Sequence, residues 1–221
     1  MKNILIIHAH PEEQSFCSSL RHTATKHFKT LGYQVKESDL YSMGFNPVGG
    51  KNDFIKLDNP EFFKYQMEQV NAFTNNFFVD ELKIEMDKLL WCDVLIFNFP
   101  MWWFGLPSIL KGWVDKVFAM GFVYGNGKGV YENGTFKDKT ALITMTTGGP
   151  EIAYNGGKNG NMENILFPIN HGMFYFAGMT VLPPFISYSP ARKTEEELKI
   201  ELNRYVNYLK DFDNHVPIYK S

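Results

Sequence analysis

The stretch DVLIFNFPMWWFGLPSILKGWVDKVF, residues 93–118, places an apolar run, an aromatic turn and a helical pattern in direct succession. The run Asp93–Phe99 is short and mostly apolar, as expected of a strand that is buried on both faces of a parallel sheet. Pro107 opens the helical pattern that continues to Val117, and proline suits the first turn of a helix because no amide hydrogen bond is needed there. This succession predicts an α/β fold.

Aromatic residues crowd the short turn between this strand and this helix. All four tryptophans of the chain lie within Trp91–Trp113, and Trp102 and Trp103 are adjacent. A turn that only reversed the chain would be better made from Gly, Asn, Asp or Ser. The turn therefore predicts either a flat apolar ligand resting on these rings or an exposed patch for a partner protein.

The same alternation of strand and helix continues through the rest of the chain. Asn3–His10 reads as a buried first strand, and Ser15–Gly32 as a helix with Ser15 at its N-cap. Further strands are expected at residues 33–40, 140–149 and 179–188, and further helices at residues 80–90, 161–176 and 193–212. This pattern predicts one domain over residues 1–221, with a flavodoxin-like, doubly wound, five-stranded parallel sheet of order 2-1-3-4-5 and helices on both faces. The two prolines of the last strand place it at an edge.

Composition narrows the class of protein. Of the 221 residues 44% are hydrophobic, and the net charge is −2 without a basic stripe, which argues against a nucleic-acid partner. No run approaches the roughly 20 apolar residues of a membrane span, and the run in MKNILIIHAH is too short for a signal peptide. We therefore expect a cytoplasmic protein that is not transmembrane.

The two cysteines, Cys17 and Cys92, are too far apart in the sequence to indicate a disulfide framework. Cys92 lies beside a strand and reads as a small core residue. Cys17 lies near a helix start, where a thiol can be activated, but no histidine or second cysteine stands at a useful spacing. A catalytic role for Cys17 is therefore disfavoured, and no metal site is expected.

In a flavodoxin-like sheet, ligands bind beyond the carboxyl ends of the strands, at the switch point between strands 1 and 3. Three turns meet there: HAHPEEQSF (residues 8–16), FPMWWFG (residues 99–105) and TTGGPEIAY (residues 146–154). Neither G-x-G-x-x-G nor G-x-x-x-x-G-K occurs, which disfavours Rossmann and P-loop nucleotide binding.

The residues of each turn allow two interpretations, one in which they bind a ligand and one in which they are only structural. In the first turn, the free amides of a helix start and donors from His10, Gln14 and Ser15 could bind a phosphate. The structural alternative is that Ser15 only caps the helix. Gly148 and Gly149 let backbone amides approach a ligand, or they only form a tight turn. Together, a phosphate site, an aromatic wall and an amide-rich turn indicate a flavin site.

Five segments carry a resemblance that covers residues 3–219: AHPEEQSF, ESDLYSMGFNP, FPMWWFGLPSILKGWVDKVF, TTGGP with a following tyrosine, and FAGMTVLPP. In this order and spacing they resemble the NAD(P)H:quinone oxidoreductase (DT-diaphorase) family. The resemblance implies a homodimer that holds FAD, with FMN as the alternative. It also implies ping-pong chemistry, in which NAD(P)H reduces the flavin and a quinone, or a nitro or azo compound, then oxidises it. The alternative function is a regulatory flavoprotein that docks on a membrane transporter, as some relatives do.

By position, the resemblance implies four groups of site residues. The flavin phosphates and ribityl chain would contact His10, Gln14, Ser15, Phe16 and Cys17. The isoalloxazine would lie against Pro100, Met101, Trp102, Trp103 and Phe104. Its polar edge would face Thr146, Thr147, Gly148, Gly149 and Tyr154. The substrate pocket would comprise Trp103, Phe104 and, from the neighbouring subunit, Tyr124 and Phe176.

The chain departs from the family's best-known members at three positions. Asn159 stands where those members pair the tyrosine with a histidine, and one residue is deleted between the two. Cys17 replaces an asparagine near the flavin phosphates. Leu198 stands where those members have an arginine close to the adenosine, which weakens the case for FAD against FMN.

The first departure leads to a hypothesis about the catalytic residues. Tyr154 and Asn159 can donate hydrogen bonds to the reduced flavin, but neither carries a positive charge. Lys158, the neighbour of Asn159, is charged and would take over the electrostatic part of the histidine's role. Two alternatives stay open: the amides of Gly148 and Gly149 supply this stabilisation, or Lys158 points into solvent.

Overall fold

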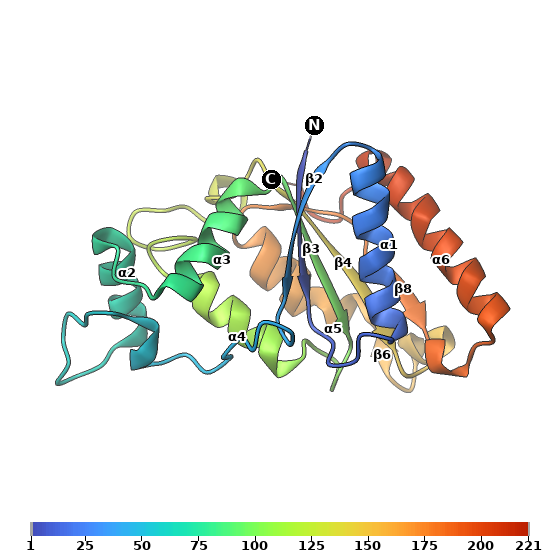
Figure 1. Ribbon diagram of the computed structural model, residues 1–221, viewed down its shortest axis with the longest axis horizontal. Coiled ribbons are helices and arrows are strands. Elements are labelled where there is room, and N and C mark those ends of the chain that lie inside the picture. Colours follow the sequence, from blue (N-terminus) through green and yellow to red (C-terminus); the bar gives the residue numbers. More distant parts are fainter. Residues whose placement is uncertain (1, 221) are drawn as a thin grey trace.

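The structure, a computed structural model that describes residues 2–220, has a twisted parallel sheet at its centre (Figure 1). The strands pair in the order β2-β1-β3-β4, and β7 and β8 both pair with the far side of β4. A separate two-stranded hairpin is formed by β5 and β6. The strands are β1 (Asn3–His8), β2 (Gln34–Asp39), β3 (Val94–Pro100), β4 (Thr140–Thr147), β5 (Asn155–Gly157), β6 (Gly160–Asn161), β7 (Thr180–Val181) and β8 (Phe185–Tyr188).

Helices cover both faces of the sheet. Figure 1 shows α1 and α6 on one side and α2, α3 and α4 on the other. The helices are α1 (Phe16–Thr30), α2 (Tyr65–Asn75), α3 (Asp80–Trp91), α4 (Ser108–Val117), α5 (Met162–Ile169) and α6 (Glu195–Lys210). Within residues 2–220, no helix is both long and apolar enough to cross a lipid bilayer.

The core divides into two clusters because successive side chains of a strand point to opposite faces. Ile4 and Ile6 of β1 pack with residues of α1 and α6, whereas Leu5 and Ile7 pack with residues of α3, α4 and α5. Every residue of β3 is buried, as its apolar sequence predicts. The predicted fold and strand order are confirmed.

Local signals also hold at several helix ends. Ser15 caps α1, because its hydroxyl accepts a hydrogen bond from the Ser18 amide at 3.1 Å. Thr194 and Glu197 form a reciprocal capping box at the start of α6. The helix predicted to begin at Pro107 begins one residue later, at Ser108, and Pro107 is the N-cap residue of α4.

Three elements differ from their predictions. The fifth strand is interrupted between β7 and β8 at Pro183 and Pro184, because proline cannot donate to the sheet ladder. The region predicted as a single helix, residues 161–176, consists of α5 and a π-helical turn, Asn170–Tyr175. The π-helical turn begins two residues after Pro168. The hairpin of β5 and β6 was not predicted, because its few glycine-rich residues show no alternating pattern.

The long excursion between β2 and α3 is fixed by buried charges. Lys116 of α4 pairs with Asp53 at 2.9 Å and donates to the Asn46 carbonyl at 2.8 Å. The hydroxyl of Tyr65 also donates to Asp53, at 2.7 Å. These contacts hold the excursion against the helix that follows the aromatic turn.

Candidate functional site

A cavity of about 560 Å³ lies where the turns after β1, β3 and β4 meet. Its walls contain residues from all three of these turns, as the switch-point argument predicts. The lining residues are His10, Ser15, Phe16, Cys17, Pro100, Met101, Trp102, Thr146, Thr147, Gly148, Pro190, Ala191 and Leu198. Ten of the fifteen predicted cofactor residues therefore line one cavity. The other five, Gln14, Trp103, Phe104, Gly149 and Tyr154, lie in the same turns without lining it.

The β1–α1 turn presents hydrogen-bond donors to this cavity. Within the described residues, the amides of Phe16 and Cys17 at the start of α1 have no acceptor. The Nδ1 atom of His10 accepts from the Glu12 amide at 3.0 Å, which places the proton of a neutral ring on Nε2. Burial lowers the pKa of His10, so the neutral ring is favoured. Free amides at a helix start form an anion site, which suits a phosphate.

The aromatic turn has a strained backbone. Trp102 and Gly105 exchange hydrogen bonds of 3.2 and 3.0 Å between their backbones, which makes a two-residue hairpin turn. The central residues, Trp103 and Phe104, have φ values of 50° and 59°. Asn and Gly normally occupy such positions, and a side chain there costs about 1–2 kcal/mol per residue.

The rings on this turn are also exposed to solvent. Trp103 is 97% exposed and Phe104 is 49% exposed. Strain of this kind persists where a function requires the residues, and exposed aromatic surface marks a binding site. On this turn Trp102 lines the cavity, whereas the rings of Trp103 and Phe104 lie outside its lining and are exposed.

The turn after β4 contains Gly148 and Gly149, whose surroundings differ. A Cβ atom at Gly149 would lie 2.9 Å from the hydroxyl oxygen of Tyr154, so the packing of that ring requires glycine. A Cβ atom at Gly148 would meet nothing within 4 Å, because this residue faces the open cavity. The amides of both glycines have no acceptor within the described chain. They are available to a ligand in the cavity.

The predicted catalytic residues follow this turn directly. Tyr154 is buried beneath it, 7% exposed, at the end of the short helix Glu151–Tyr154. Lys158 is exposed at the turn between β5 and β6, and the Asn159 amide donates to the Ala153 carbonyl at 3.0 Å. None of the three lines the cavity, so their chemical roles stay predictions.

Tyr124 and Phe176 are brought together, but away from this cavity. Their ring centroids are 5.6 Å apart in an edge-to-face arrangement, and both line a separate cavity of about 400 Å³ beside α4. The Tyr124 hydroxyl accepts from Gln66 Nε2 at 2.9 Å. Within one chain these residues therefore cannot close the first cavity, and only a second subunit could bring such a pair to it.

A buried polar network contacts Cys17, one of the residues that line the first cavity. His8 Nδ1 lies 2.5 Å from Asn98 Oδ1, and His8 Nε2 lies 3.2 Å from the Ser18 hydroxyl. The Cys17 thiol donates to the same Asn98 oxygen at 3.6 Å. Burial raises the pKa of Cys17, so the thiol stays protonated and is a poor nucleophile. This environment agrees with the expectation that Cys17 is not catalytic.

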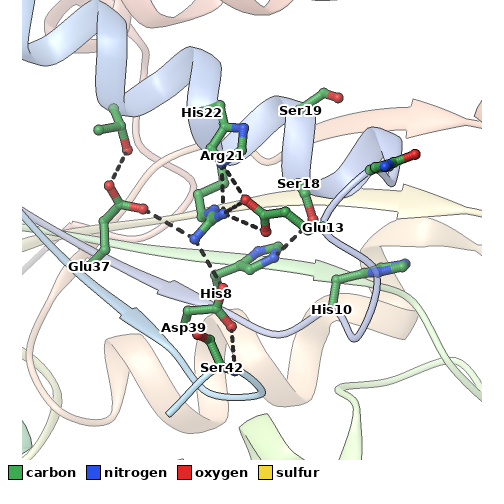
Figure 2. Close-up of polar contacts among 12 residues, drawn as sticks. His8, His10, Glu13, Ser18, Ser19, Arg21, His22, Glu37, Asp39 and Ser42 are labelled. Carbon is green, nitrogen blue, oxygen red and sulfur yellow. Dashed lines mark hydrogen bonds and ion pairs between the residues drawn. The ribbon is translucent and has the colours of Figure 1, made fainter.

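An ion cluster beside the β1–α1 turn was not predicted (Figure 2). Arg21 of α1 is 8% exposed and pairs with Glu13 at 2.7 Å, Asp39 at 3.1 Å and Glu37 at 3.6 Å. Glu13 also contacts His22 at 2.9 Å. Because Glu13 directly precedes Gln14 and Ser15, the cluster ties the turn to the end of β2.

Comparison with known proteins agrees with this geometry. Residues 2–209 match a family described by its flavodoxin-like fold. Over 220 residues the chain is 39% identical to the ribosyldihydronicotinamide dehydrogenase (quinone) of Rattus norvegicus, which covers 99% of this chain and 95% of the relative. The chain belongs to the NAD(P)H:quinone oxidoreductase (DT-diaphorase) family. The resemblance that its motifs carry is therefore confirmed.

Further members of this quinone oxidoreductase family match over most of the chain. NAD(P)H dehydrogenase (quinone) 1 of Rattus norvegicus is 38% identical over 191 residues, which are 86% of this chain and 69% of the relative. A solved structure from Klebsiella pneumoniae, provisionally named a quinone reductase, superposes with a TM-score of 0.95 at 34% identity. It covers 99% of this chain and 87% of its own.

Proposed function

We propose that this chain is a flavin-dependent oxidoreductase that transfers electrons from NAD(P)H to a quinone. The observation that carries the proposal is the cavity at the switch point, where ten predicted cofactor residues from three turns come together. Relatives named as quinone dehydrogenases and matched along nearly the whole chain support it.

The residues around this cavity fit a flavin. Free amides of Phe16 and Cys17 suit its phosphate, and free amides of Gly148 and Gly149 suit the polar edge of its ring. A bound flavin supplies two-electron chemistry between a dihydronicotinamide and a quinone. We propose FAD as the form held, with FMN as the alternative.

The chain's own groups have defined tasks in this proposal. Met101 and Trp102 of the aromatic turn provide an apolar wall that orients a flat ring, and the rest of this turn excludes water from the ring. The Gly148 and Gly149 amides stabilise negative charge at the ring's edge, with help from the Tyr154 hydroxyl and the Lys158 ammonium group. Asn159 keeps the loop between them in place through its bond to Ala153.

We further propose that the enzyme is a homodimer with a shared site. Trp103 and Phe62, at 97% and 64% exposed, are large apolar side chains that a single chain leaves uncovered. A symmetric interface would cover such surface and could bring Tyr124 and Phe176 of one subunit to the cavity of the other. Sedimentation combined with activity at decreasing protein concentration tests this proposal, because a fully active monomer would contradict it.

Steady-state kinetics test the function itself. Protein reconstituted with flavin should oxidise NADH or NADPH only when a soluble quinone, or a nitro or azo compound, is present to accept electrons. Parallel reciprocal plots at varied quinone concentration would indicate the ping-pong order. Turnover that requires an added reductase would instead indicate an electron carrier, and absence of turnover with bound flavin would leave a regulatory role.

A further inference from the structure

His8, the last residue of β1, is completely buried, but two hydroxyl groups connect it to the first cavity. Its Nε2 atom lies 3.2 Å from the Ser18 hydroxyl, and that hydroxyl lies 3.0 Å from the hydroxyl of Ser15. Ser15 caps α1 and lines the cavity. A titratable ring therefore lies close behind the turn that is predicted to bind a phosphate.

The contacts of the Ser18 hydroxyl fix the direction of its hydrogen bonds. The Glu12 carbonyl, at 2.9 Å, can only accept, so Ser18 donates its single proton there. The Ser18 oxygen is then an acceptor toward the ring of His8. His8 Nε2 must therefore carry a hydrogen to bond with it.

The other ring nitrogen of His8 also faces an acceptor. Nδ1 lies 2.5 Å from Asn98 Oδ1 on β3, and the Cys17 thiol donates to the same oxygen at 3.6 Å. Only an imidazolium donates from both ring nitrogens, so these partners favour the charged form of His8.

The neutral form of His8 also has a place in this network. Within residues 2–220, Asn98 Nδ2 is buried and has no hydrogen-bond partner. Because no contact fixes that nitrogen, the amide can turn over and donate it to an unprotonated Nδ1. The surroundings of His8 therefore accept the ring in either charge state.

Without a ligand, the neutral form is favoured. Burial lowers the pKa of His8, and the hydrogen bond with Asn98 opposes this effect without overcoming it. Charged and titratable groups also face the ring from the neighbouring elements: Arg21 and Cys17 of α1, Asp39 of β2 and His10 of the turn that follows β1. Figure 2 shows the ring of His8 beside Arg21, whose charge is already paired with carboxylates.

His10, the other histidine of this turn, differs from His8 in its contacts. Its Nδ1 accepts from the Glu12 amide at 3.0 Å, and that amide can only donate. A second proton on His10 would therefore break this hydrogen bond. Of the two rings, His8 is the one whose partners admit a second proton.

The first cavity lacks a cation for a phosphate. Among the described residues that line it, none is a lysine or an arginine. The free amides of Phe16 and Cys17 and the dipole of α1 supply hydrogen bonds and partial charge only. A negative ligand next to a buried, neutral histidine raises the proton affinity of that ring, because opposite charges attract strongly where water is excluded.

We propose that His8 takes up one proton from the solvent when the flavin phosphate binds, and that its imidazolium supplies the positive charge that the cavity lining lacks. This inference rests on the proposed function. His8 does not line the cavity, so it acts through its charge and through Ser18 as a positioning residue for the cofactor.

Calorimetry counts the proton. Apoprotein is titrated with FAD near pH about 6.5, the ordinary pKa of a histidine, in buffers of different ionisation enthalpy. FAD is the suitable probe because its pyrophosphate keeps a constant charge in this range. The parent should take up a large part of one proton and bind FAD about ten-fold more tightly at about pH 6 than at about pH 8. Riboflavin, which has no phosphate, should bind without proton uptake.

Three histidine variants locate the proton. His8→Gln keeps an N–H donor but cannot be charged, so its FAD affinity should be independent of pH and its proton uptake lost. His27→Gln is the matched control, because burial also lowers the pKa of His27, which does not line the cavity. It should keep the uptake, and so should His10→Gln even if its affinity falls. Uptake that persists in His8→Gln, or that His10→Gln abolishes, would overturn the inference.

A measurement on the parent protein does not depend on how the variants fold. With ¹⁵N-labelled histidine, the ring signals of one buried histidine should change to those of an imidazolium when FAD is added, and not when riboflavin is added. If FAD binds and no histidine gains a proton, the inference is wrong and the proposed function stands. If FAD and FMN both fail to bind, the proposed function is wrong as well.

Discussion

The Nη2 atom of Arg21 lies 2.7 Å from one carboxylate oxygen of Glu13 and 2.8 Å from the other. Glu13 belongs to the turn that carries Gln14 and Ser15, whereas Arg21 is anchored on α1 and also pairs with Asp39 at the end of β2. Figure 2 shows the guanidinium among these carboxylates, beside His8 and Ser18. The pair therefore holds the predicted phosphate-binding turn in its position.

Loss of this pair should weaken binding of the flavin phosphate. We expect Glu13→Gln and Arg21→Met each to reduce FMN affinity of the apoprotein about ten-fold, because the turn is no longer fixed. Riboflavin, which lacks the phosphate, should bind as it does to the parent. Fluorescence titration with both flavins measures this.

The two variants distinguish positioning from charge. Glu13→Gln removes a negative charge near the phosphate, so a purely electrostatic role would make FMN binding tighter. Tighter FMN binding to Glu13→Gln, or equal losses for FMN and riboflavin, would contradict the positioning role.

Tyr154 and Lys158 should stabilise the charge on reduced flavin. Each of Tyr154→Phe and Lys158→Ala is expected to slow flavin reduction by NADPH roughly ten-fold, as loss of one charge-stabilising contact does. Stopped-flow absorbance between about pH 5.5 and 8.5 measures the step, and no titration from a relay histidine is expected in this range. Parental rates in both variants would leave the Gly148 and Gly149 amides as the source of stabilisation.

The strained aromatic turn should lower the stability of the fold while its rings favour flavin binding. Phe104→Gly is expected to raise the free energy of unfolding by about 1 kcal/mol, because glycine adopts the left-handed φ of 59° without strain. The same change should weaken flavin binding, since the ring is lost. Phe104→Ala is the matched control, because it removes the ring and keeps the strain. Urea unfolding of the apoproteins measures the free energy of unfolding of each variant. Equal values for the Gly and Ala variants would show that the backbone is not strained.

One buried and two half-buried histidines should make stability depend on pH. Burial lowers the pKa of His8, His10 and His27, so the folded chain takes up protons at these rings at lower pH than the unfolded chain. Below the unfolded value of about 6.5 the unfolded chain binds more protons, and the free energy of unfolding should fall as the pH falls. The loss of stability through these rings ends once the pH is below their folded pKa values.

His27→Gln tests this outside the cavity. Urea unfolding between about pH 5 and 7.5, around the unfolded pKa, should show a shallower loss of stability for His27→Gln than for the parent. Glu201 interferes little, because its stabilising contribution is lost between its unfolded pKa of about 4.3 and its folded pKa of about 2, which lies below the range measured. Equal slopes for the two proteins would show that His27 does not contribute.

The central sheet could be predicted because its signals are local. Runs such as Ile4–Ile7 and Val94–Phe97 are apolar on every residue, and this pattern indicates strands buried on both faces. The turns that follow them then had to meet at the switch point, which is why most of the lining of the first cavity was foreseen.

The parts that were missed depend on contacts between distant residues. Arg21 meets Glu13, Glu37 and Asp39 only once β2 lies beside β1, and no periodic pattern marks such a cluster. Arg192 and Arg204, which line a cavity beside β8, come from a short 3-10 helix and from α6 and do not form a basic run in the sequence. Tyr124 and Phe176 were singled out only through the resemblance, and their place in a subunit interface remains a proposal.

The most direct test of the account follows the flavin through one catalytic cycle. Protein loaded with flavin is mixed without oxygen with NADPH, and then with a soluble quinone, while flavin absorbance is recorded. We expect one flavin per chain, loss of the oxidised spectrum on addition of NADPH, and full recovery on addition of the quinone. Failure to bind flavin after reconstitution, or bound flavin that neither NADPH nor NADH reduces, would contradict the account.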